Sequence, residues 1–224
     1  MAKQSKRYIN QLKAVPNEAT SLADAVAKVK GFTAKFDQSI ECVVNLGIDP
    51  KQADQLVRGA ISLPHGIGKQ KKVVAFCEDS DVEAAKKAGA IEAGSDELVK
   101  KITDGWMDFD VAIASTKVMG KVGKLGRVLG PQGKMPSPKN GTVTNDVVTA
   151  VGEFAAGKVE FKNDAGGNVH VIVGRQSFDA QKLVENIDAF INQIKKMKPS
   201  TSKGTYIKKM CISATMSPGV EVVV

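Results

Sequence analysis

Residues 71–94, KKVVAFCEDSDVEAAKKAGAIEAG, place a helical pattern between two short apolar runs. The helical pattern ends at Gly89, a residue type that commonly closes helices. The same order repeats downstream, and strands that alternate with helices indicate a small parallel βαβ unit. The sequence predicts strands at 71–77, 90–94 and 108–115, and capped helices at 80–89 and 95–105.

The two ends of the chain have a different pattern, in which extended segments joined by turns accompany amphipathic helices. Ala165-Gly166-Gly167 separates two extended segments and predicts a β-hairpin. The predicted helices cover 20–32 and 177–199, and the predicted extended segments cover 39–47, 58–69, 158–164, 168–175, 204–213 and 219–224.

The two ends of the chain share one pattern of extended segments and helices, and the middle has another. We therefore expect one domain to be inserted into another. The expected fold class is α/β with two domains. Residues 1–66 and 158–224 would form a discontinuous split α/β domain with a mainly antiparallel sheet. Residues 67–157 would form an inserted Rossmann-like βαβ domain, connected through the Gly/Pro-rich segment LPHGIGK (63–69) and through Gly157.

The segment LGRVLGPQGKMPSPKNGTVT, residues 125–144, cannot form one continuous helix or strand, because glycines and prolines interrupt it. No Asp or Glu occurs from Val111 to Asn145, and Asn145 is expected to cap the next helix. Uncovered glycine N–H groups and lysines can bind phosphate, whereas the alternative is a solvated loop that its lysines keep soluble. The basic side chains expected to face a ligand are Lys121, Lys124, Arg127, Lys134 and Lys139.

The charge balance favours a polyanionic partner. The chain has 224 residues, with 32 Lys and Arg against 24 Asp and Glu, so its formal charge is +8. An excess of this size fits either nucleic acid or an acidic membrane surface.

The first 15 residues lack the apolar core of a secretory signal, and no apolar run is long enough to span a bilayer. Three widely spaced cysteines fit free thiols in a reducing compartment.

A nucleotide-binding enzyme is one alternative. GEFAAGKV, residues 152–159, has the glycines and lysine of a phosphate-binding loop, but Val159 stands where a Mg²⁺-binding Ser or Thr is needed. The segment also lies at a helix end, whereas backbone amides cradle phosphate at a helix start. His65 and His170 are the two histidines, and no Cys/His spacing resembles a metal site. We therefore expect no catalytic residue, no metal and no cofactor.

The glycine-rich segment 125–144 closely resembles the signature of the bacterial-type ribosomal protein L-one family, whose members form the mobile stalk of the large subunit. Further family-like segments occur in family order over nearly the whole chain. They are FDQSIECVVNLGIDP, VRGAISLPHGIGKQ, DGWMDFDVAIA, FKNDAGGNVH, NIDAFI, KPSTSKGTYIKK and SATMSPGV.

The resemblance implies that the discontinuous domain makes the main contact with large-subunit ribosomal RNA and that the glycine-rich loop is secondary. It also implies roles in releasing deacylated tRNA from the exit site and in repressing translation of the protein's own mRNA. The protein would be cytoplasmic, on the ribosome, with no membrane contact, and monomeric off the ribosome. The positions that match RNA-contacting residues of the family are Lys35, Phe36, Ser39, Glu41, Asp164, Gly167, His170, Gly174, Thr215, Met216, Ser217 and Gly219.

Two alternatives to this function stay open. The nucleotide enzyme would bind ATP or a dinucleotide saturably, and its affinity for RNA would fall away at physiological salt. A general nucleic-acid regulator would bind DNA and unrelated RNA as well as ribosomal RNA.

Overall fold

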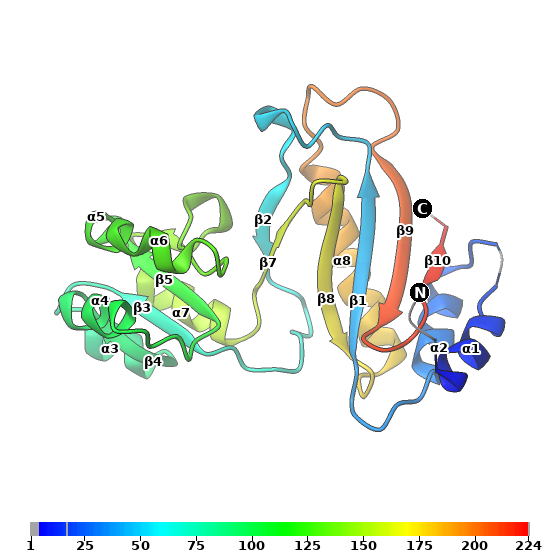
Figure 1. Ribbon diagram of the computed structural model, residues 1–224, viewed down its shortest axis with the longest axis horizontal. Helices are drawn as coiled ribbons and strands as arrows, with labels where there is room; N and C mark the ends of the chain where they lie inside the picture. The colour runs from blue at the N-terminus through cyan, green and yellow to red at the C-terminus, as the bar shows by residue number, and fades with distance from the viewer. Residues whose placement is uncertain (1–4, 17, 224) are drawn as a thin grey trace. The chain divides into compact units, whose positions relative to one another are not determined.

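The computed structural model describes residues 5–16 and 18–223. The chain forms two compact units, whose elements are labelled in Figure 1. Unit 1 consists of Met1–Gly68 and Val159–Val224, and unit 2 consists of Lys69–Lys158. The predicted boundaries, after residues 66 and 157, lie within two residues of these divisions. The predicted α/β class, with antiparallel pairing in one unit and a parallel sheet in the other, is confirmed.

Unit 1 is built on an antiparallel sheet with the strand order β10-β9-β1-β8. Its strands are β1 (Ser39–Leu46), β8 (Asn168–Arg175), β9 (Ile207–Ala214) and β10 (Val220–Val222). Strand β1 comes from the N-terminal part of the chain and lies between two strands from the C-terminal part. The sheet therefore joins the two segments that unit 2 separates in the sequence. Burial alternates along β1, as expected for a strand with one face in the core.

Two helices, α2 (Leu22–Gly31) and α8 (Ala180–Lys196), cover one face of this sheet, and Figure 1 shows α8 behind the strands. Helix α2 begins after Ser21, whose hydroxyl accepts a hydrogen bond from the N–H of Asp24. Leu183, Ile187, Phe190 and Ile194 of α8 are fully buried in the core of unit 1. The amphipathic helices predicted at 20–32 and 177–199 are confirmed.

The predicted hairpin is only partly correct. The N–H of Asp164 donates to the carbonyl of Asn168 at 2.8 Å, so the turn forms, and a bridge joins Asn163 to Val169. Beyond that bridge, β7 (Val159–Lys162) pairs with β2 (Arg58–Ile61) and not with β8. The strands separate because β8 pairs along β1, whereas β7 and β2 form a second antiparallel sheet. The remaining elements of unit 1 are α1 (Lys6–Lys13) and the 3₁₀ turn η1 (Ala53–Gln55).

Unit 2 contains a parallel sheet with the strand order β4-β3-β5-β6. The strands are β3 (Val73–Phe76), β4 (Ala90–Gly94), β5 (Val111–Ser115) and β6 (Val143–Thr144). Strands β3 and β5 are buried along their whole length, as expected for parallel strands covered on both faces. The three predicted strands and their parallel arrangement are confirmed, although β3 and β5 are shorter than expected.

The helix caps of unit 2 differ from the prediction. Helix α7 is capped by Asp146 and not by Asn145, because the Asp146 carboxylate accepts the N–H of Thr149 at 3.1 Å. Asp81 and Ser95 precede the first two helices, and neither accepts a capping hydrogen bond. The helices are α3 (Val82–Lys87), α4 (Asp96–Thr103), α5 (Met119–Val122), α6 (Gly126–Leu129) and α7 (Val147–Ala155).

The glycine-rich segment folds into a series of short turns. Between α5 and α6 lies the 3₁₀ turn η2 (Gly123–Leu125), and η3 (Pro138–Asn140) follows further along. Buried Leu125 and Leu129 anchor these turns in the core of unit 2. No continuous helix or strand spans the segment, as expected, but its glycine N–H groups are not all uncovered. The N–H of Gly130, for example, donates to the carbonyl of Gly126 at 2.9 Å.

Candidate nucleic-acid interface

The face of the unit 1 sheet opposite α2 and α8 carries none of the helices that unit 1 forms within its described residues. Strand β1 places Ser39, Glu41, Val43 and Asn45 on this open face, and all four are partly exposed. Three of them carry a hydroxyl, a carboxylate or an amide. The face can therefore form hydrogen bonds with a ligand that lies across the strands.

The strand register brings several positions that match RNA-contacting residues of the family into neighbouring rows on this face. Glu41 pairs with Ile172 of β8 and with Ser213 of β9, and Val43 pairs with His170. Directly paired residues lie on the same side of a sheet, with Cβ atoms about 5 Å apart. His170 is exposed in the row next to Glu41, where both can reach one ligand.

Two exposed apolar side chains stand at the end of the sheet where β1 begins and β9 ends. Phe36 is 51% exposed and Met216 is 54% exposed, which is unusual for side chains of this size. The N–H of Ser39 donates to the Thr215 hydroxyl oxygen at 3.2 Å, and the N–H of Thr215 donates to the Ser39 carbonyl at 3.1 Å. These bonds hold the loop before β1, with exposed Lys35, beside the loop after β9.

Gln38, a residue that the sequence did not single out, connects these loops from inside. Its side chain has no exposed surface. Its Oε1 atom accepts hydrogen bonds from the N–H of Met216 at 3.0 Å and from the hydroxyl of Ser217 at 3.4 Å. Its Nε2 atom donates to the carbonyl of Phe32 at 2.9 Å and to Oε1 of Gln176 at 3.1 Å. One buried amide thus links three segments that are distant in the sequence.

Helix α1 contacts the same two loops from outside. The Arg7 guanidinium donates to the carbonyl of Met216 at 3.0 Å, and the Gln11 side chain donates to the carbonyl of Thr33 at 3.3 Å. Because Gln38 holds the N–H of Met216 and Arg7 holds its carbonyl, side chains fix both polar groups of that residue. The exposed Met216 side chain is therefore presented from a constrained backbone.

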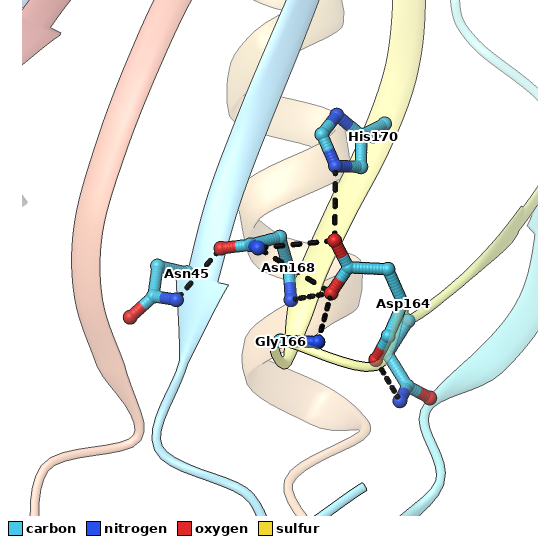
Figure 2. Close-up of polar contacts among 6 residues, drawn as sticks. Asn45, Asp164, Gly166, Asn168 and His170 are labelled. Atoms are coloured by element: carbon cyan, nitrogen blue, oxygen red, sulfur yellow. Dashed lines mark hydrogen bonds and ion pairs between the residues drawn. The ribbon is translucent and has the colours of Figure 1, made fainter.

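The turn at the other end of the open face depends on Asp164 (Figure 2). Its Oδ1 accepts the N–H groups of Gly166 at 2.8 Å and Asn168 at 2.7 Å. Its Oδ2 accepts the Asn168 side-chain amide at 3.0 Å and lies 3.6 Å from Nε2 of His170. Hydrogen bonds from the Asn168 side chain and then from its N–H lower the pKa of Asp164 to about 2. This carboxylate, which is unexpected beside RNA, organises the turn, and the Asn45 amide extends the network by donating to Asn168 at 2.7 Å.

Two glycines among the family-matched positions are buried, where they are needed for backbone conformation or close packing. Gly167 has φ of 77°, a conformation that favours glycine, and its carbonyl accepts the N–H of Leu46 at 2.9 Å. A Cβ atom on Gly174 would lie 2.7 Å from Leu183 Cδ2, so a side chain there would collide with α8. By contrast, Gly219 is exposed after β9.

The basic residues of the glycine-rich region divide into two groups in unit 2. Lys124, Arg127 and Lys139 are exposed, and exposed Lys121 forms an ion pair with Asp96 at 2.7 Å. Lys134 instead points into its own unit. Its ammonium donates to the carbonyls of Met107 at 3.0 Å and Phe109 at 2.6 Å, and lies 4.9 Å from the centre of the Phe109 ring.

Clusters suited to metal binding are absent from the part of the chain that the structure describes. No three His, Cys, Asp or Glu side chains in that part are grouped to hold a metal ion. Cys42, Cys77 and Cys211 are free, and burial raises the pKa of Cys42 to about 12, which leaves its thiol unreactive at neutral pH. No helix within that part is long and apolar enough to cross a membrane.

Comparison with known proteins shows similarity to ribosomal proteins. The model of the family described as "Ribosomal protein L1p/L10e family" matches residues 26–218. The chain is also similar to "Large ribosomal subunit protein uL1" of Kosmotoga olearia. The two sequences are 51% identical over 223 residues, which cover 99% of this chain and 96% of that protein.

Proposed function

The chain belongs to the L1p/L10e family of ribosomal proteins, as a constituent of the large ribosomal subunit and not an enzyme, and we propose that it binds large-subunit ribosomal RNA through unit 1. The proposed surface is formed by residues 35–41, 164–174 and 215–219, and we call it the recognition face. The observation that carries the proposal is that these three segments, far apart in the sequence, meet on one open sheet face and its two ends.

The chemistry of the recognition face suits folded RNA. Phe36 and Met216 offer apolar contact to sugars or unstacked bases. Glu41 and His170 can hydrogen-bond to base edges and to ribose 2′-hydroxyls, and the 2′-hydroxyls distinguish RNA from DNA. Aromatic residues make up only 5% of the chain, too few for an extended stacking platform, so recognition of shape is the mode that fits.

The same face would serve a second RNA. The proposal includes repression of the protein's own mRNA, through an mRNA site that presents the same shape as the ribosomal site. On the cytoplasmic ribosome, the bound protein would form the mobile stalk and take part in releasing deacylated tRNA from the exit site. Off the ribosome it would be a monomer. Units 1 and 2 would act as the RNA-binding domain and the inserted domain.

Exposed basic residues of unit 2 would make a secondary contact with RNA. Lys121, Lys124, Arg127 and Lys139 have side chains that can reach phosphate. Lys134 is the least suited of the predicted set, because its ammonium already binds two carbonyls.

A salt-titrated binding assay tests the proposal. The stalk fragment of large-subunit ribosomal RNA is compared with a scrambled RNA of equal length, using the wild type, Phe36→Ala and Met216→Ala. We expect the wild type to prefer the stalk RNA by at least about 10³-fold, a typical ratio for a specific nucleic-acid complex. Each substitution should remove much of that preference and leave the salt dependence unchanged, because neither residue is charged.

Ile91→Ala is a matched control, because Ile91 of unit 2 is 48% exposed and lies outside the recognition face. It should leave the preference intact. Equal affinity of the wild type for the two RNAs would contradict the proposed function. A wild-type preference that survives both Phe36→Ala and Met216→Ala would contradict the choice of surface. A competition arm, in which the mRNA site displaces the stalk RNA, tests whether both RNAs use one face.

A further inference from the structure

The positive charge of unit 1 is concentrated in one segment outside the recognition face. Unit 1 contains 18 Lys and Arg against 12 Asp and Glu, a difference of +6. Residues 189–214 contain six lysines and no acidic residue. The rest of unit 1 therefore has 12 basic and 12 acidic residues and is formally neutral.

The family-matched positions of the recognition face supply little electrostatic attraction for RNA. Of its matched positions, Lys35 is the basic one, whereas Glu41 and Asp164 carry carboxylates. Affinity for nucleic acid at physiological salt depends largely on lysines and arginines that replace counterions at phosphates. A neutral or slightly negative surface can recognise shape, but the electrostatic part of the affinity has to come from other residues.

Five exposed lysines of residues 195–208 have no ion-pair partner closer than 4 Å among the described residues, and we call them the lysine ridge. The sixth lysine of the segment, Lys209, is excluded because it pairs with Glu221 at 2.5 Å. The ridge consists of Lys195, Lys196, Lys198, Lys203 and Lys208.

The first two ridge residues have a local role that needs no ligand. Lys195 and Lys196 lie in the last turn of α8, where positive charge interacts favourably with the helix dipole. Lys198, Lys203 and Lys208 lie beyond the helix and have no such role.

The loop that carries Lys198 and Lys203 is hydrogen-bonded to Gly47, the residue that follows β1. The Ser202 hydroxyl donates to the carbonyl of Gly47 at 2.9 Å, and the N–H of Gly47 donates to the carbonyl of Tyr206 at 2.7 Å. A Cβ atom on Gly47 would lie only 2.2 Å from the Thr205 carbonyl oxygen, so the close approach requires glycine. Because the backbone is already ordered, binding phosphate here would cost mainly side-chain entropy.

The ridge adjoins the open face of the sheet. Lys209 pairs in register with Asn45, which bonds to Asn168 in the turn organised by Asp164. The ridge loop contacts Gly47, two residues further along the chain from Asn45. RNA that covers the turn end of the recognition face therefore passes next to the ridge.

We propose that the lysine ridge is a phosphate-binding surface that supplies the electrostatic part of the affinity of unit 1 for RNA, separately from the residues that supply its specificity. This inference rests on the proposed function, because it takes the ligand to be RNA. Its chemistry is that of a phosphodiester backbone held by ammonium groups without regard to base sequence.

The test uses a triple variant, Lys198→Gln with Lys203→Gln and Lys208→Gln, in the full-length protein. The control is Lys86→Gln with Lys87→Gln and Lys100→Gln, which removes the same charge from exposed positions of unit 2. Affinity for the stalk RNA and for a scrambled RNA is measured across a series of KCl concentrations. Thermal unfolding checks that both variants are folded.

We expect the ridge variant to reduce the slope of log affinity against log salt by about 2 for both RNAs, because each phosphate contact contributes about 0.7–0.9. Its preference for the stalk RNA should stay at the wild-type ratio, and the control should leave the slope close to wild type. An unchanged slope in the ridge variant, or an equal reduction in the control, would overturn the inference. A wild type without preference for the stalk RNA would instead overturn the proposed function, whatever the slopes are.

Discussion

The buried side-chain oxygen of Gln38 accepts a hydrogen bond from the main-chain N–H of Met216 at 3.0 Å, although 178 positions separate the two residues. The amide nitrogen of the same side chain donates to Phe32 and Gln176. Phe36 lies between Phe32 and Gln38 in the sequence, so one amide fixes the loops of both exposed apolar side chains. The geometry of the proposed recognition face is therefore set by a side chain that is buried beneath it.

Replacing this amide tests that relationship. Gln38→Leu keeps the approximate volume but leaves the N–H of Met216 without its partner. We expect unit 1 to lose about 1–3 kcal/mol of stability, the usual cost of an unsatisfied buried group. Amide hydrogen exchange should show faster exchange at Met216, with Val44 of the same sheet as the internal control. If the N–H of Met216 stays as protected as in the wild type, Gln38 does not position this loop.

Arg7 should act on RNA binding through the Met216 carbonyl. Arg7→Met removes the hydrogen bond, which is exposed, so stability should change by less than about 1 kcal/mol. A looser Met216 would lower affinity for the stalk RNA by about threefold to tenfold, which corresponds to about 0.6–1.4 kcal/mol. Lys6→Met is the matched control, because it removes the same charge from the neighbouring position of α1. Equal losses in the two variants would mean that only charge matters.

The elements of the fold followed from local patterns, whereas the contacts of the site did not. Alternating burial in β1 and the apolar stripe of α8 depend on neighbours in the sequence, so their period is visible there. The turn at Asp164 was also visible, but the sequence could not show that β7 would pair with β2. Which strands pair depends on which strand edges are available in the folded chain, and those edges come from segments that are distant in the sequence.

The contacts of single side chains were likewise not visible in the sequence. Lys134 looked like a phosphate ligand because it lies in a basic, glycine-rich segment, yet its ammonium binds carbonyls of Met107 and Phe109. Gln38 gave no signal, because a glutamine beside a strand is usually exposed. Asn168 flanks a turn that the sequence did predict, so it could have been inferred from the habit of Asn to bond locally.

The turn of Asp164 should weaken in acid. Its pKa falls from 3.8 in the unfolded chain to about 2 in the folded chain, so the ionised form is favoured by folding. Its contribution to stability is fully present above pH 3.8 and is lost as the pH falls through about 2. The difference in Tm between wild type and Asp164→Asn should therefore be constant from pH 7 to about pH 5 and shrink towards pH 2. A difference that does not depend on pH would show that the charge of Asp164 contributes nothing.

Lys134 and Lys139 should have separable effects, because one is bound within unit 2 and the other is exposed. Lys134→Met removes two hydrogen bonds to carbonyls and a cation–π contact, and should cost unit 2 about 1–3 kcal/mol. Trp106, the one tryptophan of the chain, lies 5.6 Å from the Phe109 ring, so its fluorescence reports unfolding of this region. The salt dependence of RNA binding should not change.

Lys139→Gln should show the opposite behaviour. Its stability should stay within about 0.5 kcal/mol of wild type, as for most surface substitutions. If the glycine-rich segment contacts RNA, the salt slope of binding should fall by a little under 1, the contribution of one phosphate contact. A reduced slope in Lys134→Met with unchanged Trp106 unfolding would mean that Lys134 leaves its carbonyls to bind RNA. An unchanged slope in Lys139→Gln would exclude this residue from the secondary contact.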